Sequence, residues 1–121
     1  MTNQSIINKL IPNNSKSSSA KMNVGVCQIQ LRLPENQSLK GKRRVIKSII
    51  TRLHNKFNIA VAEVDNQDSW QLATLGLTCV SNHRSYDNET LSNAIRFISQ
   101  NYPELELLSS EIEIFSAPLK S

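Results

Sequence analysis

The sequence has few aromatic residues, few glycines and few cysteines, and each shortage excludes a class of function. Aromatic side chains make up 5% of the chain, which argues against a sheet whose rings stack RNA bases. The three glycines are far apart, so no glycine-rich loop is present to hold a nucleotide phosphate. The two cysteines, Cys27 and Cys79, lie in apolar stretches, so we expect buried, reduced thiols and a cytoplasmic protein.

Long apolar runs are also absent. No stretch approaches the roughly 20 residues that a membrane-spanning helix needs. Residues 1–21 are rich in Asn, Ser and Lys, with too short an apolar stretch for a signal peptide. We expect a disordered polar N-terminal extension there, with an organelle transit segment as the alternative. Residues 22–116 then form a single domain, and residues 117–121 form a short C-terminal tail.

Apolar periodicity predicts six structural elements after the extension. Ser38 suits the N-cap of a helix that runs to about Lys56, and Pro103 ends a second helix. The last segment changes its apolar parity, which predicts either one strand with a bulge or a pair of strands with a break, around residues 108–110. The predicted elements are a strand at 24–33, a helix at 39–56, strands at 57–65 and 70–81, a helix at 85–102 and a strand at 104–115.

The order of these elements is typical of one fold. A β-α-β-β-α-β chain forms an α+β, ferredoxin-like sandwich, with a four-stranded antiparallel sheet and both helices on one face. The alternative is a parallel doubly wound sheet, which requires a helical crossover between successive strands. The second and third strands have only a short polar link between them, so we predict the ferredoxin-like sandwich.

Charge is divided by position along the chain. Residues 1–62 carry 11 Lys/Arg and a single acid, Glu35, whereas residues 63–121 carry 3 Lys/Arg and 9 Asp/Glu. No carboxylate side chain occurs between Asn36 and Ala62. A block of this kind suits a polyanion, and RNA is the polyanion we expect in a soluble protein.

The first predicted helix carries most of this charge. Cations in the first turns of a helix have the unfavourable sign, because unpaired N–H groups leave a partial positive charge there. Gly41 lies in the first turn, where a missing Cβ would let a phosphate approach the backbone. The predicted ligand is RNA or a ribosomal particle, with neither a membrane nor sequence-specific DNA as partner. The predicted RNA- or anion-binding residues are Lys40, Lys42, Arg43, Arg44 and Lys47.

A second polar concentration follows the second predicted strand. It is a possible site for a polar ligand or an interaction, and its residues are Glu63, Asp65, Gln67, Asp68, Trp70 and Gln71. Turn chemistry alone also explains much of this composition. The segment lacks the glycine and the distal glutamate of a calcium loop, so we expect no metal and no cofactor.

No catalytic constellation is visible in the sequence. His54 and His83 have no Cys or Asp at catalytic spacing, and nothing nucleophilic is adjacent to the carboxylates. We therefore expect a binding protein rather than an enzyme, with a small hydrolase or ligand sensor as a lesser alternative. The main rival hypothesis is an oligomeric interaction module, because the acidic half of one copy suits the basic half of another. A homodimer or a higher oligomer would result.

Three sequence blocks carry a resemblance to a known family. They are SLKGKRRV from Ser38, RLHNKFNIAVAEVD from Arg52 and QDSWQLATLG from Gln67. The chain from Met22 to about Phe115 resembles the YlxP-like family of small bacterial proteins, a domain of unknown function. The extension before Met22 is outside the pattern of that family.

The resemblance implies a ferredoxin-like fold and no established activity. Genes of the family often lie beside those for translation initiation and ribosome maturation factors, which implies a role linked to the ribosome. The positions that match the signature stretches of the family are Lys40, Arg43, Arg44, Glu63, Asp65, Gln67, Asp68, Trp70 and Gln71.

Overall fold

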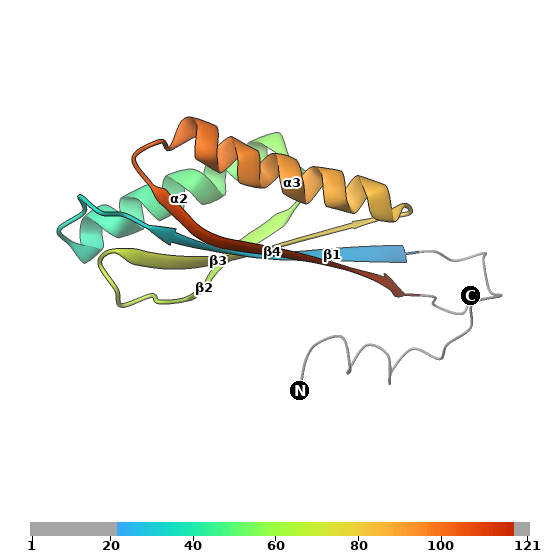
Figure 1. The fold of residues 1–121 in the computed structure, drawn as a ribbon, viewed down its shortest axis with the longest axis horizontal. Coiled ribbons are helices and arrows are strands. Elements are labelled where there is room, and N and C mark those ends of the chain that lie inside the picture. The colour runs from blue at the N-terminus through green and yellow to red at the C-terminus, as the bar shows by residue number, and fades with distance from the viewer. Residues whose placement is uncertain (1–21, 118–121) are drawn as a thin grey trace.

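A computed structural model describes residues 22–117, so the predicted disordered extension and the end of the predicted tail lie outside the described residues. The elements follow the predicted order (Figure 1). They are β1 (Met22–Arg32), α2 (Leu39–Lys56), β2 (Ala60–Asp65), β3 (Leu72–Ser81), α3 (Arg84–Asn101) and β4 (Glu106–Ala117).

The four strands form a single antiparallel sheet in the order β2-β3-β1-β4. Both helices lie on one face of this sheet, and within residues 22–117 no helix lies against the other face, called here the helix-free face (Figure 1). The α+β, ferredoxin-like sandwich predicted from the order of the elements is therefore confirmed. Because β2 and β4 are the two edges of the sheet, they lie at opposite flanks of the domain.

Alternation along the central strands builds the core between the sheet and the helices. In β1 the odd-numbered residues are buried, and Ile29 lies opposite Leu75 of β3. From the helices, Ile49 and Leu53 of α2 and Leu91 of α3 complete the same cluster. Even-numbered residues of β1 point to the helix-free face, which leaves that face available to solvent or to a partner.

Several predicted boundaries differ from the structure by one to three residues, and two of the differences have a clear local cause. Phe57 caps the C-terminus of α2 instead of starting β2, and its ring packs edge-on against Phe97 of α3, with centroids 6.0 Å apart. Trp70 precedes β3 instead of starting it, because residues 66–71 form a turn before Leu72. The tryptophan is consequently a loop residue.

The irregularity predicted in the last segment is a bulge within one strand, β4, and not a break between two strands. Gln30 pairs with Ser109, but Leu31 pairs with Leu107, so Leu108 is the extra residue. This insertion changes which side of the sheet alternate side chains face, and Ile112 and Ile114 thereby reach the core. Neither α2 nor α3, the helices of the described part of the chain, is long and apolar enough to span a membrane.

Candidate functional site

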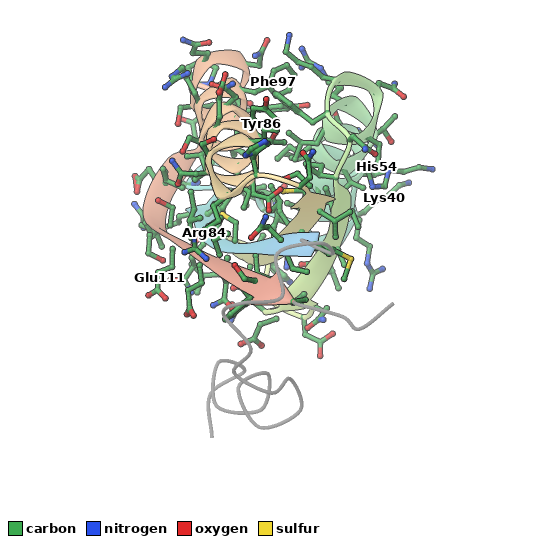
Figure 2. The ribbon with its side chains drawn as sticks, turned by 90° about the vertical axis from the view of Figure 1, so that its right-hand side faces the viewer. Lys40, His54, Arg84, Tyr86, Phe97 and Glu111 are labelled. Carbon is green, nitrogen blue, oxygen red and sulfur yellow. The ribbon has the colours of Figure 1, made fainter. Side chains whose placement is uncertain are left out.

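The outward side of α2 carries a group of exposed cations, which we call the cationic face. It consists of Lys40, Arg43, Arg44 and Lys47, all of them exposed. The helical period of 3.6 residues gathers these four positions on one side, opposite the apolar stripe that packs on the sheet. Lys40 points to the flank of the domain, and His54 lies farther along the same flank (Figure 2).

The cationic face has no acidic partner in the described part of the chain. The ion pairs among residues 22–117 are Arg32–Glu106 and Lys42–Glu63, and neither involves these four cations. The first turn of α2 contains no acid that would offset them locally. The four cations therefore present uncompensated positive charge to solvent.

Lys42 is a correction to the predicted RNA-binding set. Its side chain is 1% exposed, and its Nζ lies 2.8 Å from Glu63 Oε2 of β2 and donates a hydrogen bond to the Asn66 backbone oxygen. A phosphate cannot reach an ammonium group enclosed in this way, so Lys42 does not belong to a binding surface. Its spacing from Ile46 and Ile49 is the signal that sequence reasoning missed, because i, i+4 and i+7 share one helix face.

The partner of Lys42 is held by the local shape of β2. Glu63 lies opposite Leu75 and faces the helices, whereas the strand becomes irregular between Glu63 and Asp65. Asn66 then adopts a positive φ of 64°, and its side-chain oxygen accepts a hydrogen bond from Thr74 at 2.6 Å. These contacts fix the carbonyl of Asn66 toward Lys42 and so connect the start of α2 to the end of β2.

Gly41 has a different role from the one expected. Its N–H donates to the Ser38 side chain at 2.9 Å, so the predicted N-cap is confirmed and this N–H is already paired. A Cβ at Gly41 would overlap the Oδ1 atom of Asn36. The space beside this glycine therefore holds a protein side chain and does not admit a phosphate to the backbone.

The second predicted cluster is divided between structural contacts and exposed groups. Gln71 Nε2 donates to the backbone oxygen of Pro34 at 3.2 Å, and Asp65 Oδ1 accepts from the Asn66 N–H at 2.7 Å. The side chain of Gln67 reaches back to the Glu63 carbonyl oxygen at 3.4 Å. These hydrogen bonds hold the β2–β3 loop in shape, although the residues whose side chains make them are exposed, as are Asp68 and Trp70.

The carboxylates of this cluster do not converge. Glu63 faces Lys42, whereas Asp65 pairs with the N–H of Asn66 beyond the irregularity in β2. Within residues 22–117, no group of three or more His, Cys, Asp or Glu side chains is arranged to hold a metal ion. The structure therefore gives these side chains no single position at which they could bind a polar ligand together.

The second half of α2 uses its cations for packing. Arg52 lies over the Phe97 and Tyr102 rings, with Cζ 5.1 and 5.3 Å from their centroids, and donates to Asn101 Oδ1 at 3.1 Å. Lys56 Nζ lies 5.6 Å from the Phe97 centroid. The density of charge along the sequence does not show which cations of α2 pack against α3 and which form the cationic face.

The two cysteines are buried free thiols, as expected. Burial raises the pKa of Cys27 to about 11. Burial, with the adjacent Asp87 carboxylate, raises the pKa of Cys79 to about 12, and its Sγ lies 3.5 Å from Asp87 Oδ1. At neutral pH both groups are protonated, which makes them poor nucleophiles.

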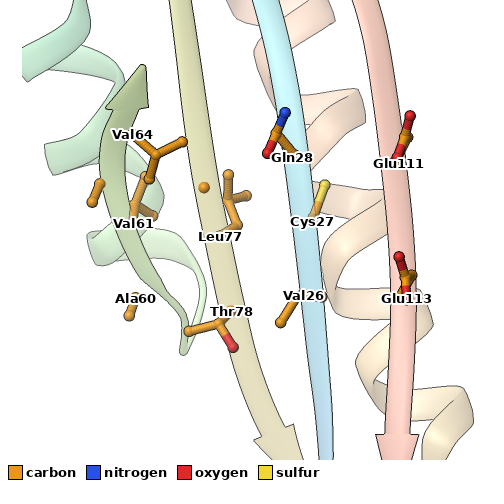
Figure 3. Close-up of a pocket in the computed structure, with 12 residues that line it drawn as sticks. Val26, Cys27, Gln28, Ala60, Val61, Val64, Leu77, Thr78, Glu111 and Glu113 are labelled. Carbon is orange, nitrogen blue, oxygen red and sulfur yellow. The ribbon is translucent and has the colours of Figure 1, made fainter. Parts of the chain in front are cut away.

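The helix-free face of the sheet contains a shallow depression of about 460 Å³ that crosses all four strands (Figure 3). Val26, Val64 and Thr78 contribute to its floor, and Val64 lies over Gly76, where a Cβ would come within 2.9 Å of it. Glu111 and Glu113 of β4 lie along one side of the depression (Figure 3). The depression therefore combines an apolar floor with an acidic border.

Comparison with known proteins identifies a family. The sequence profile described as "Protein of unknown function (DUF503)" matches residues 24–112. A Bacillus subtilis (strain 168) protein described as "Uncharacterized protein YlxP" is 35% identical over 92 residues, which cover 76% of this chain and 99% of that protein. The resemblance read from the three sequence blocks is confirmed.

Solved structures give weaker likenesses. A C-terminal segment of the alpha subunit of aIF2 from Pyrococcus abyssi superposes with a TM-score of 0.47 at 9% identity, covering 80% of this chain and 51% of that segment. The chain thus spans about half the length of that segment. The de novo designed protein Foldit4 gives a TM-score of 0.42 at 16% identity, covering 78% of this chain and 96% of the designed one. Scores at this level carry no functional meaning.

Proposed function

We propose that this chain, which belongs to the DUF503 family of proteins of unknown function, is a non-enzymatic cytoplasmic protein that binds RNA or a ribosomal particle. Its place would be in translation or ribosome maturation. The observation that carries the proposal is the cationic face, whose four exposed cations have no acidic partner among residues 22–117. Lys42, two positions after Lys40 and on the other side of the helix, has such a partner.

The position of these cations favours an anionic ligand. Positive charge near a helix N-terminus is unfavourable by about 0.3–1 kcal/mol for each exposed group. Like charges on one helix face also repel one another. Phosphates placed along this face would offset both effects, and they would release counterions from the RNA as they bind.

The contact would be made by side chains and not by the helix terminus. Ser38 caps the N-terminus of α2, and Asn36 occupies the space beside Gly41. The ligand therefore meets the long, mobile ammonium and guanidinium groups of the cationic face. Contacts of this type position a protein on the phosphate backbone without reading sequence.

A charge-reversal pair tests this proposal. Lys40→Glu with Arg44→Glu should remove co-sedimentation with ribosomal particles in a sucrose gradient, because two phosphate contacts become repulsions. The matched control is Arg84→Glu with Arg96→Glu, which makes the same change in net charge on α3, where both arginines are exposed. If both double variants lose co-sedimentation equally, net charge and not the cationic face is responsible.

Salt dependence gives an independent measurement. Four phosphate contacts to a single strand predict a slope of about −3 in log K against log salt, or a loss of about 50-fold between 50 and 200 mM salt. Each substitution of one of these cations by alanine should reduce the slope by a little less than one. A slope near zero would exclude phosphate contacts as the source of affinity.

A second candidate function is supported by the distribution of charge over the domain. Lys40 and Glu111 lie at opposite flanks (Figure 2), and Glu111 borders the depression on the helix-free face (Figure 3). A second copy could place its cationic face on this acidic border. Such head-to-tail contacts are heterologous, so they produce rings or filaments.

Light scattering at low and at high salt separates this candidate from RNA binding. Self-association through opposite charges predicts oligomers at low salt that dissociate at high salt. Glu111→Lys with Glu113→Lys should abolish the oligomers and leave RNA binding intact. A monomer at both salt concentrations would exclude the interaction module.

A further inference from the structure

Trp70 is an exposed aromatic residue for which the fold shows no internal use. It is the sole tryptophan of the chain and is 56% exposed. Among residues 22–117, the aromatic and cation–π contacts involve other rings, not the indole of Trp70. A large ring left in water forgoes the burial that usually stabilises it, and such rings are common at recognition sites.

The loop that carries Trp70 lies against the start of α2. Asn36 Nδ2 donates to the backbone oxygens of both Trp70 and Ser38, each at 2.6 Å. Ser38 is the N-cap of α2, and Lys40 follows it within the first turn. Trp70 and the cationic face are therefore at the same end of the domain, connected through one asparagine side chain.

The backbone around Trp70 is fixed from both sides. Ser69 Oγ accepts hydrogen bonds from the N–H groups of Gln71 and Leu72, at 3.3 and 3.0 Å. Gln71 in turn contacts the β1–α2 loop through Pro34. A ring on a backbone held in this way loses little conformational freedom when a ligand packs on it.

The charge of the loop restricts what the ring can receive. Asp65 and Asp68 are exposed acids in and beside this loop, so it repels phosphate. The cationic face attracts phosphate. A ligand that meets both regions must place its phosphates along α2 and a neutral group against the loop, which is how a nucleotide separates its backbone from its base.

We infer that Trp70 stacks an unpaired base of a single-stranded RNA whose phosphates lie along the cationic face. The inference rests on the proposed function and specifies its ligand class. In duplex RNA the bases are stacked inside the helix, where a loop tryptophan cannot reach their faces. Aromatic stacking on successive bases is the common means of holding single strands without a strong sequence preference.

The location of the ring also agrees with the scarcity of aromatic residues on the sheet. The absence of aromatic side chains from β1 also argues against base stacking on the sheet. A single ring at the edge of a cationic helix needs no sheet platform. It would hold one base, while the phosphates supply the remainder of the affinity.

Trp70 offers its own spectroscopic probe. Titration of the full chain with an oligouridylate of about ten nucleotides should quench its fluorescence, because a stacked base contacts the indole directly. Anisotropy of the labelled RNA should show that Trp70→Ala weakens binding by at least about fivefold, and that Trp70→Phe retains most of the affinity. The salt slope should not change, because tryptophan carries no charge.

Tyr86 provides the matched control. It is 55% exposed, but it lies on α3 and packs against His83, with ring centroids 4.9 Å apart. Tyr86→Ala should leave RNA affinity unchanged, and a duplex of the same length should bind Trp70→Ala and the unmodified chain equally. Thermal melting of each variant establishes that it is folded before binding is compared.

The outcomes distinguish the inference from the function on which it rests. If Trp70→Ala binds the single strand as tightly as the unmodified chain while Lys40→Glu with Arg44→Glu abolishes binding, the stacking inference is overturned and the RNA-binding proposal stands. If the charge reversal also leaves binding unchanged, the proposed function fails. Equal loss of single-strand and duplex affinity in Trp70→Ala would mean that the ring supports the fold of the loop and does not stack a base.

Discussion

The inward and outward faces of α2 both carry positive charge, and they hold it in different ways. On the inward face, Lys42 is enclosed between the helix and β2, paired with Glu63 and bonded to the Asn66 carbonyl. On the outward face, the four cations of the cationic face are exposed and have no acidic partner among residues 22–117. Neighbouring residues in the sequence therefore differ: one cation stabilises the fold, and the others are exposed and available to a ligand.

The difference shows that a buried charge needs polar partners, whereas an exposed charge does not. An ammonium group removed from water must recover its lost hydration through partners, and Lys42 has a carboxylate and a carbonyl for this purpose. An exposed ammonium group keeps its water and needs no partner. Unpaired charge on the outward face is thus compatible with a stable domain, and it remains available for binding.

The largest expected effect comes from breaking the inward pair. Lys42→Met should lower the free energy of unfolding by about 3–5 kcal/mol, because it leaves Glu63 largely buried without its counter-charge. Urea denaturation measures the loss. The affinity of the folded variant for RNA, and its salt slope, should be unchanged, since Lys42 is outside the cationic face.

A double substitution gives the control. Lys42→Met with Glu63→Leu removes both charges, so much of the lost stability should return. Recovery would identify the uncompensated carboxylate as the cause of the destabilisation. If the double variant is as unstable as Lys42→Met, the lysine acts through the shape of its side chain or through Asn66, and the contrast between the two faces loses its electrostatic basis.

Most of the fold was predictable because its signals are local and repeated. Alternation in β1 and the 3.6-residue stripe of α2 specify which sides face the core. The parity change predicted a bulge or break around residues 108–110, and the structure places a bulge at Leu108. The short link between β2 and β3 excluded a parallel crossover. Boundaries were less certain, since Trp70 and Phe57 belong to a turn and a cap whose contacts come from distant residues.

The candidate site was predictable only in part. Composition identified α2 as the basic helix, but density of charge does not reveal which cations point inward. Lys42 was assigned to the surface because lysines usually lie there, although its spacing from Ile46 placed it on the buried side. The contact between Asn36 and Trp70 joins residues 34 positions apart, and no local pattern in the sequence signals it.

A smaller effect compares the two ends of α2. Arg52→Ala should lower the free energy of unfolding by about 1 kcal/mol, because it removes contacts with Phe97 and Tyr102 that connect the helices. Arg44→Ala has no such contact among residues 22–117 and should change stability by less than about 0.5 kcal/mol. Thermal melting compares the two variants.

The order of the two effects should reverse when RNA affinity is measured in place of stability. Arg44→Ala should weaken RNA affinity and reduce the salt slope, whereas Arg52→Ala should change neither. Equal losses of affinity in both variants would mean that the ligand follows the whole length of α2. The division of the helix into a binding half and a packing half would then be wrong.

The smallest effect is expected at the other ion pair of the described chain. Arg32 and Glu106 contact each other through two hydrogen bonds, of 2.9 and 3.0 Å, but both side chains are nearly half exposed. Water already solvates exposed partners, so such pairs contribute little to stability. Glu106→Gln should therefore leave the free energy of unfolding at neutral pH close to that of the unmodified chain, as urea denaturation would show.

Acid pH sharpens this comparison between a surface pair and a buried one. The hydrogen bond from Arg32, and then its charge, hold the pKa of Glu106 below its ordinary value of 4.5. A carboxylate with a lowered folded pKa stabilises the fold above the unfolded pKa, and that contribution disappears as the pH falls through the folded pKa. The small difference between the unmodified chain and Glu106→Gln should shrink as the pH falls below 4.5 and vanish once the pH is below the lowered pKa of Glu106. High salt should remove it as well. A loss at neutral pH as large as that of Lys42→Met would mean that burial is not what separates structural from available charge in this domain.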